Sequence, residues 1–149
     1  MAGLSNERGL SPTVNFVLVT GISLLLIGGL FTGISGVLED RRGAAVNDGL
    51  EVTSHQLAAD IAAADRAAQT ADSGHITIET RLPVRIAGTR YSIEIRENGS
   101  SIVLVLQSED PSATARTTVD NETAVATGTY RGGPLTLEWN GDTIEVDDA

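Results

Sequence analysis

The spacing of apolar residues divides the chain into three consecutive regions. Between Arg8 and Glu39 no residue is charged, and this run of roughly 30 residues exceeds the ~20 that a helix needs to cross a bilayer. From Ala44 to Ala71, apolar and small residues recur with the period of an α-helix. After Gly74 the period changes to two, which is typical of β-strands. The pattern predicts an α+β fold with an apolar helix, an amphipathic helix and a small β-rich domain.

The second region carries a heptad-like stripe of apolar and small residues. Arg41–Gly43 predicts a hinge or an interface break before it, and Asn47–Gly49 predicts a point where the helix is interrupted or recapped. A nearly continuous helix from Ser11 would have ~60 residues and a length of ~90 Å. Such a stripe also suits a helix packed on its own β-domain. The stripe consists of Leu50, Leu57 and Ala64, with Ser54, Ile61 and Ala68 between them, and Asp60, Asp65 and Arg66 lie off it.

The third region predicts short strands joined by tight turns. Asn98-Gly99 is the strongest short hairpin signal, and Asn140–Asp142 marks a second hairpin. We expect about six to eight short antiparallel strands in a small sheet or sandwich packed on the helix. The predicted strands are Ile76–Thr80, Tyr91–Arg96, Ile102–Leu106, Leu135–Trp139 and Thr143–Val146, with weaker ones near Arg116–Val119 and Thr123–Ala126.

The charge balance describes an acidic protein without lysine. Twenty Asp and Glu residues oppose ten basic residues, the net charge is −10, and every basic residue is Arg. This argues against nucleic acid as a partner, because phosphate binding needs a basic face. The balance fits a protein kept soluble in very high salt, where repulsion between acids is screened; the alternative is a GC-rich genome that encodes Arg in place of Lys. The absence of Cys excludes disulfides and thiolate chemistry.

Catalytic chemistry is poorly represented in this sequence. His55 lies on the predicted helix and His75 at the turn into the first strand, and a metal site would need a third ligand that the pattern does not supply. The carboxylates lack the spacing of a calcium loop, and there is no Gly-x-Ser-x-Gly elbow. We therefore expect no enzyme, no cofactor and no metal.

Three kinds of N-terminal segment compete for the apolar run. A secretory signal has an apolar stretch of only ~7–15 residues before its cleavage site, and Gly33–Val37 makes a poor site of that kind. A simple membrane anchor fits the length but does not account for the residues just before the run. There a basic residue and a glycine precede the apolar stretch without a gap. The segment Arg8-Gly9-Leu10-Ser11-Pro12 resembles the start of archaeal, especially haloarchaeal, type IV pilins and pilin-like proteins, which carry a class III prepilin signal.

This resemblance implies a processing event and a structural role. A prepilin peptidase would cut between Gly9 and Leu10 on the cytoplasmic side and leave the apolar helix on the mature protein. The protein would be anchored in the membrane, with its C-terminal domain outside, and would then assemble with sister subunits into a pilus or pseudopilus-like filament at the cell surface. The implied regions are a leader (1–9), a transmembrane and assembly helix (10–38), an amphipathic helix (39–73) and an acidic extracytoplasmic β-domain (74–149).

The chain departs from the pilin pattern close to the processing site. Val14 stands at mature position five, where bacterial pilins usually carry Glu, and Thr13–Phe16 replaces the Val-Ile-Gly that is common in archaeal pilins. These departures favour a divergent pilin-like protein over a major pilin. The alternative is a single-pass anchored extracytoplasmic domain that binds a partner and never polymerises. Basic residues are balanced on the two sides of the run. An inside N-terminus therefore rests on the resemblance and on the fact that a short N-terminal tail with an acidic C-terminal domain suits export.

Small residues in the apolar run suggest helix packing. Gly29 and Gly33 form a Gly-x-x-x-Gly pair, and Gly36 belongs with Gly28 and Thr32 to a second row. Such rows let helix backbones approach closely, although glycine is also frequent in spanning helices in general.

Two sequons are candidate glycan acceptors if the domain is exported. They begin at Asn98 (Asn98-Gly99-Ser100) and at Asn121 (Asn121-Glu122-Thr123), and both fall in predicted turns or loops. The alternatives are turn chemistry for Asn98 and chance for Asn121.

Overall fold

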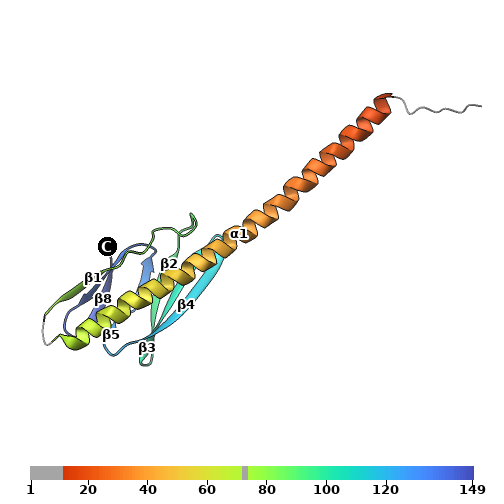
Figure 1. Ribbon diagram of the computed structural model, residues 1–149. Helices are drawn as coiled ribbons and strands as arrows, with labels where there is room; N and C mark the ends of the chain where they lie inside the picture. Colours follow the sequence, from red (N-terminus) through yellow and green to blue (C-terminus); the bar gives the residue numbers. More distant parts are fainter. Residues whose placement is uncertain (1–11, 72–73) are drawn as a thin grey trace, which may run out of the picture. The chain divides into compact units, whose positions relative to one another are not determined.

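The computed structural model describes residues 12–71 and 74–149, apart from the side chains at positions 34 and 35. Its first element is α1 (Pro12–Thr70), a helix of 59 residues (Figure 1). Proline suits the first turn of a helix, where its missing N–H costs no hydrogen bond. By their internal contacts the residues form two units, Met1–Asp40 and Arg41–Ala149, which we describe separately.

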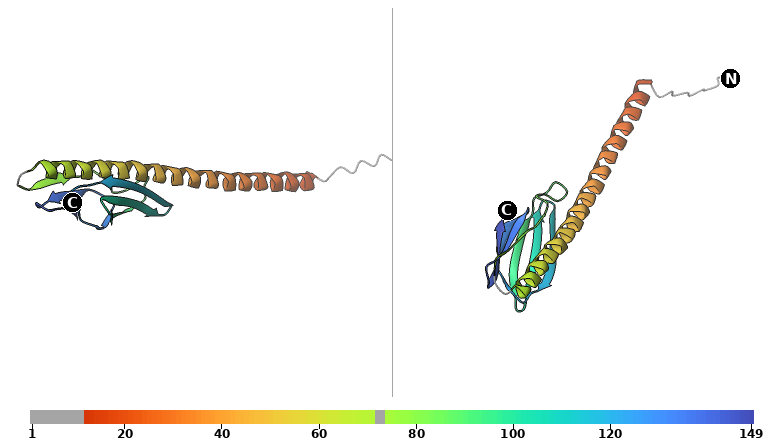
Figure 2. Two further views of the ribbon diagram at one scale, coloured as in Figure 1. Left: turned by 90° about the horizontal axis from the view of Figure 1, so that it is seen from below. Right: turned by 60° about the vertical axis from the view of Figure 1, so that its left-hand side comes forward.

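The second unit contains two four-stranded sheets beside the C-terminal part of α1. In both views of Figure 2 this part of the helix runs along the sheets. The strand orders are β1-β7-β8-β5 in the first sheet and β4-β3-β2-β6 in the second. The strands are β1 (Ile76–Glu79), β2 (Ser92–Asn98), β3 (Ser101–Glu109), β4 (Ser112–Asp120), β5 (Ala124–Val125), β6 (Gly128–Arg131), β7 (Leu135–Trp139) and β8 (Thr143–Asp148). The predicted α+β architecture is confirmed.

Both predicted hairpins form. In the β2–β3 hairpin Asn98 pairs with Ser101, so the two-residue loop is Gly99-Ser100 and Gly99 has a φ of 66°. In the β7–β8 hairpin the Asn140 side-chain oxygen accepts hydrogen bonds from the backbone N–H groups of Asp142 and Thr143, at 3.2 and 3.1 Å. The expectation of purely antiparallel pairing is wrong at one place, because β5 pairs with β8 in parallel over two residues.

The heptad-like stripe faces the core, as predicted. Leu50, Leu57 and Ile61 have no exposed surface, and Ser54 is equally buried. Burying a side chain of the size of Leu or Ile contributes about 1.5–3 kcal/mol, so the stripe anchors the helix to the sheets. The same cluster takes inward-facing residues from both sheets, among them Ile93, Ile95, Ile102, Leu104, Leu106, Leu135, Leu137, Trp139, Ile144 and Val146.

The predicted interruptions of the helix are absent from the structure of α1. The backbone is helical through both Arg41–Gly43 and Asn47–Gly49, so neither triplet breaks α1, although the boundary between the two units falls just before Arg41. The reason for a glycine at position 49 is a close approach: a Cβ there would lie 2.3 Å from Cγ2 of Ile86. The helical period predicted from the sequence runs to Ala71, and α1 ends one residue earlier, at Thr70.

Two further features were not anticipated. Strand β6 joins β2, but its four residues are too short to give a clear period-two signal. Asp65, which lies off the stripe in sequence, is only 6% exposed. Its carboxylate accepts hydrogen bonds from the backbone N–H groups of Glu122 and Thr123, the latter at 2.7 Å. It thereby ties α1 to the loop between β4 and β5.

Candidate functional site

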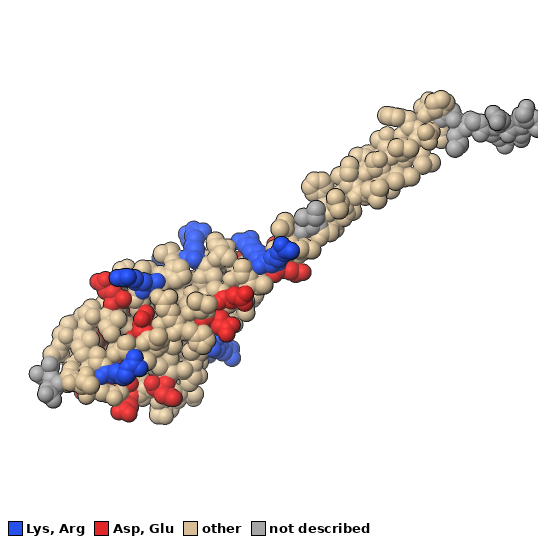
Figure 3. Space-filling view, in the orientation of Figure 1, with Lys and Arg blue, Asp and Glu red and all other residues tan. Residues whose placement is uncertain are grey.

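The apolar segment, residues 12–38 of α1, has a mainly hydrophobic and uncharged surface where its side chains are described. Its best 18-residue window has a mean hydropathy of 2.2, and none of that window is buried inside the chain. Leu25 is 77% exposed, and Phe16 and Phe31 are each 70% exposed. In the space-filling view of Figure 3 no charged side chain colours this part of the helix. The helix is therefore long and apolar enough to cross a membrane.

Two hydroxyl groups within this segment, those of Ser23 and Thr32, are bonded to the helix itself. Ser23 donates to the carbonyl oxygen of Val19 at 2.8 Å, and Thr32 donates to that of Gly28 at 3.0 Å. A polar group without a partner is costly in hydrocarbon, so bonds of this kind suit a lipid environment. The segment thus combines an apolar surface with internally paired hydroxyls.

No packing within the chain explains the glycines of this segment. A Cβ added at Gly28, Gly29, Gly33 or Gly36 would meet no other part of the described chain within 4 Å. No other element of the described chain therefore packs against the faces of the helix on which these glycines lie. The predicted processing residues, Gly9 and Leu10, lie outside the described residues.

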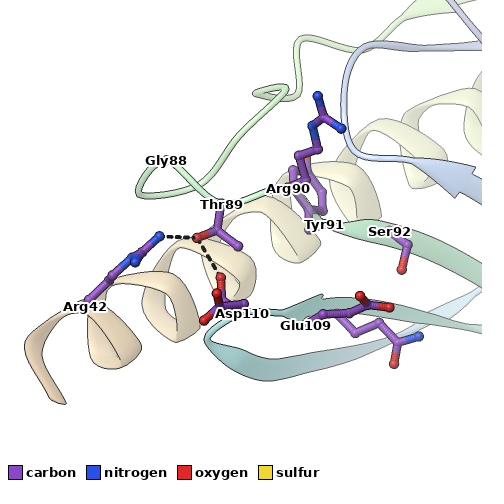
Figure 4. A pocket seen from close by; sticks show the side chains of 9 residues that line it. Arg42, Gly88, Thr89, Arg90, Tyr91, Ser92, Glu109 and Asp110 are labelled. Atoms are coloured by element: carbon purple, nitrogen blue, oxygen red, sulfur yellow. Dashed lines mark hydrogen bonds between the residues drawn. The ribbon is translucent and has the colours of Figure 1, made fainter. Parts of the chain in front are cut away.

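The second unit has a polar hollow at the base of β2 and β3. It has a volume of about 430 Å³ (Figure 4). Arg42 donates to the Thr89 hydroxyl at 3.5 Å, and Thr89 donates to the carbonyl oxygen of Asp110 at 3.1 Å. The hollow is lined by Arg42, Gly88, Thr89, Arg90, Tyr91, Ser92, Gln107, Glu109 and Asp110. The Thr89 hydroxyl thus links α1 to the turn after β3.

Tyr91 closes one side of this hollow and is itself held in place. Its side chain is buried, and its hydroxyl donates to the carbonyl oxygen of Pro83 at 2.6 Å. Burial raises the pKa of Tyr91 to about 12, because removal from water disfavours the phenolate. Tyr91 is therefore a structural phenol and not an acid–base group at ordinary pH.

The two histidines lie beside different carboxylates. His55 is 3.9 Å from Glu51, one turn earlier on α1, and His75 contacts Glu138 of β7. Within residues 12–71 and 74–149, no three His, Asp or Glu side chains are grouped so that they could hold a metal ion. The two histidines are therefore not brought together with a third ligand among the residues that the structure describes.

The two sequons have different surroundings. Asn98 is exposed at the end of β2. Asn121 is half-buried, its side-chain nitrogen donates to the carbonyl oxygen of Thr123 at 2.8 Å, and its side-chain oxygen is enclosed without a hydrogen-bond partner. The first sequon is therefore exposed over all three of its residues, whereas the asparagine of the second is partly buried and hydrogen-bonded.

Comparison with known families matches residues 5–146 to the family of unknown function DUF7266. That match spans almost the whole chain. The chain belongs to the DUF7266 family. No curated protein and no solved structure matches the DUF7266 chain.

Sequence reasoning missed several interacting residues of this DUF7266 protein. The sequence pattern places Arg42 in a predicted hinge or interface break, and neither Thr89 nor Asp110 stands out in any motif. Their meeting depends on the loop that brings residues 86–89 against α1. Asp65 gave one signal, since it interrupts an alanine-rich helix between Ala64 and Ala67, but its partners are backbone groups that no sequence pattern reveals.

Proposed function

We propose that this protein is a type IV pilin-like structural subunit, anchored in the membrane before it assembles into a pilus or pseudopilus-like filament. The observation that carries the proposal is that the two parts of α1 have different surroundings. The apolar segment presents exposed and uncharged, mainly hydrophobic surface, whereas the helix after Arg41 contributes one buried face to the core of the β-domain. A hydrophobic surface of this extent needs lipid or other helices around it.

The glycines of the apolar segment favour a subunit that packs against other helices. A glycine in a helix costs about 1 kcal/mol relative to alanine in water, and Gly29 and Gly33 return no packing gain within the chain. Close approach of a second helix would supply that gain. Sister subunits are the partners that supply such a helix in the proposed filament.

The first experiment tests processing at Gly9. Expression of the full chain with a class III prepilin peptidase is expected to give a mature N-terminus at Leu10 by mass spectrometry. The variant Gly9→Val should remain uncut, and Gly3→Val, a glycine change inside the leader, should be cut normally. A mature N-terminus other than Leu10, or cutting that does not depend on the peptidase, would contradict the proposal.

The second experiment separates a filament subunit from the alternative, a single-pass anchored binding domain. The chain has no Cys, so Gly29→Cys introduces a unique thiol. A subunit is expected to form disulfide-linked dimers through this position in the assembled state. Ile27→Cys is the matched control, because two residues turn the helix by about 200° and place it on the opposite face. Correct processing with no excess of dimers at position 29 would favour the alternative.

A further inference from the structure

We infer that Asn98, and not Asn121, is an acceptor for an N-linked glycan on the folded domain. The inference rests on the proposed function in one respect, because export places the domain on the side of the membrane where such transfer takes place. Everything else in it comes from the local structure of the two sequons. The first sequon is exposed, and its asparagine side chain makes no hydrogen bond within the described part of the chain. In the second sequon the asparagine side chain and two backbone N–H groups are hydrogen-bonded.

Asn98 is accessible to a modifying enzyme. The run Arg96–Ser100, which contains the whole sequon, is exposed. Asn98 pairs with Ser101 across the hairpin, and the Ser101 hydroxyl bonds to the main-chain oxygen of Asn98 at 3.0 Å. That bond uses the backbone, and no hydrogen bond of the Asn98 side chain occurs within the described part of the chain. The amide nitrogen of Asn98 is therefore free to react.

The turn does not require asparagine at position 98. In an Asn-Gly loop both central residues have positive φ, and asparagine tolerates that conformation better than most residues. Here the central residues are Gly99 and Ser100, and only Gly99 has a positive φ. Asn98 is the last residue of β2, where many side chains would serve. The backbone conformation of the turn therefore does not require asparagine at position 98, which favours a role for this residue in the sequon.

Asn121 has a structural role that competes with modification. Its side-chain nitrogen, the atom that would be glycosylated, already donates to Thr123. The backbone N–H groups of Glu122 and Thr123 are both held by the buried carboxylate of Asp65. All three residues of this sequon are thus fixed in one conformation. A transferase would have to break these bonds before it could reach the amide.

The chemical step is a group transfer from a lipid-phosphate-linked oligosaccharide. The side-chain nitrogen of Asn98 forms a bond to the anomeric carbon of the first sugar. The bond between that carbon and the phosphate oxygen breaks, and the lipid phosphate leaves with the electron pair. The amide loses one proton to a base of the transferase. No electrons are gained or lost overall, and the β2–β3 hairpin supplies only the acceptor.

The test is peptide mass spectrometry of the full chain from a host that has both an oligosaccharyltransferase and a class III prepilin peptidase. Trypsin separates the two sequons, because Glu97–Arg116 contains Asn98 and Thr117–Arg131 contains Asn121. A glycan mass is expected on the first peptide. Because the Asn121 amide must first give up its hydrogen bond, occupancy at Asn98 should exceed that at Asn121 by about tenfold.

Four variants test the assignment without disturbing the core. Asn98→Gln and Ser100→Ala should abolish the added mass on the first peptide, whereas Ser100→Thr, which restores the sequon, should retain it. Asn121→Gln should leave the first peptide modified. A glycan that survives Ser100→Ala, or equal occupancy at both sequons, would overturn the inference.

The same digest distinguishes failure of the inference from failure of the proposed function. An unmodified Asn98 in a chain that begins at Leu10 overturns the inference and leaves the subunit proposal standing. A glycan on Asn98 in a chain that retains the leader before Leu10 supports the inference and contradicts the subunit proposal. An unmodified Asn98 in a chain that retains this leader contradicts both.

Discussion

At Gly49 the backbone of α1 lies directly against a side chain from a distant loop. A Cβ at this position would come 2.3 Å from Cγ2 of Ile86, which is itself buried. The backbone of Ile86 is held by two hydrogen bonds with Thr89, at 2.9 and 2.8 Å, so a shift of Ile86 away from α1 would strain this turn. The absence of a side chain on α1 is what permits this contact.

We therefore expect Gly49→Ala to destabilise the domain. Overpacking costs about 1–3 kcal/mol, and the better helix propensity of alanine returns at most about 1 kcal/mol of that. Gly43→Ala is the matched control, because a Cβ there meets nothing within 4 Å; it should be neutral or stabilising. Denaturant unfolding followed through Trp139, the sole tryptophan, measures both changes. Equal effects at positions 43 and 49 would contradict the close-approach argument.

Tyr91 makes the stability of the domain depend on pH in the alkaline range. Its folded pKa of about 12 lies above the ordinary value of 10.0, so the unfolded chain loses the proton first. The stabilisation is complete below pH 10 and is lost as the pH rises towards 12. Stability measured across this range should fall in the parent chain and fall less in Tyr91→Phe.

Tyr130 is the other tyrosine and provides the control for this titration. Its pKa is also raised, first by burial and then by the negative charges of Asp147 and Asp148. Tyr91→Phe therefore leaves a single phenol, and subtraction of its absorbance titration from that of the parent isolates Tyr91. A difference curve with a midpoint near pH 10 would contradict the burial of Tyr91.

At the level of the elements, α1 is joined to the second sheet by hydroxyls as well as by apolar packing. The oxygens of Ser54 and Thr117 are 2.7 Å apart, and Ser54 also donates to the carbonyl oxygen of Glu51 at 2.8 Å. Ser54 has one hydroxyl hydrogen, which the second bond uses. Thr117 of β4 is therefore the donor across the interface between helix and sheet.

A double-mutant cycle measures this link. Ser54→Ala removes the acceptor and leaves the Thr117 hydroxyl without its partner, whereas Thr117→Val leaves Ser54 bonded to Glu51. We expect the first change to cost more than the second, with a coupling of about 0.5–1.5 kcal/mol between them. Purely additive effects would show that the two hydroxyls contribute no mutual stabilisation.

An element can be predicted from the sequence when the residues that specify it lie within that element. The sequence predicts the stripe through Leu50, Leu57 and Ile61 because one face of α1 is buried continuously in the second unit. The hairpins were readable because Gly99 and Gly141 take backbone conformations that glycine adopts readily. Strand β6 and the parallel β5–β8 pair are short and owe their formation to neighbouring strands, so their residues carry little local signal.

The candidate sites were harder to predict than the fold, for a related reason. Both sequons are visible as three-residue patterns, but only the structure separates the exposed Asn98 from the Asn121 whose amide is engaged. The link from Arg42 through Thr89 to Asp110 joins residues far apart in sequence by single hydrogen bonds. Single hydrogen bonds between distant residues produce no periodic pattern in the sequence.

At the scale of the whole molecule, the two units differ in charge and in what they contribute to the buried core. The described part of the first unit has no buried core residue of its own, and the buried core begins at Val46. Charged residues likewise are absent between Arg8 and Glu39, and most of the acids follow Arg41 (Figure 3). Folding of the domain and affinity for an apolar environment therefore depend on different stretches of the chain.

This distribution predicts that the two properties can be separated by truncation. A variant that starts at Arg41 retains every buried core residue, so it should fold, keep Trp139 in its buried environment, and remain in the aqueous fraction. The full chain should sediment with membranes and be released by detergent but not by high salt. An unfolded truncated variant, or one that still sediments with membranes, would contradict the separation.

Two aspartate substitutions of comparable exposure locate the membrane determinant more closely. Leu25 in the apolar segment is 77% exposed and Val52 on the domain part of α1 is 67% exposed. An Asp near the centre of a spanning helix costs about 2.5–3.5 kcal/mol on insertion scales, so Leu25→Asp should lower the membrane-bound fraction of the full chain. Val52→Asp should leave that fraction unchanged, because the outer face of α1 in the second unit is expected to meet water. Equal losses from both variants would show that membrane binding does not reside in the apolar segment.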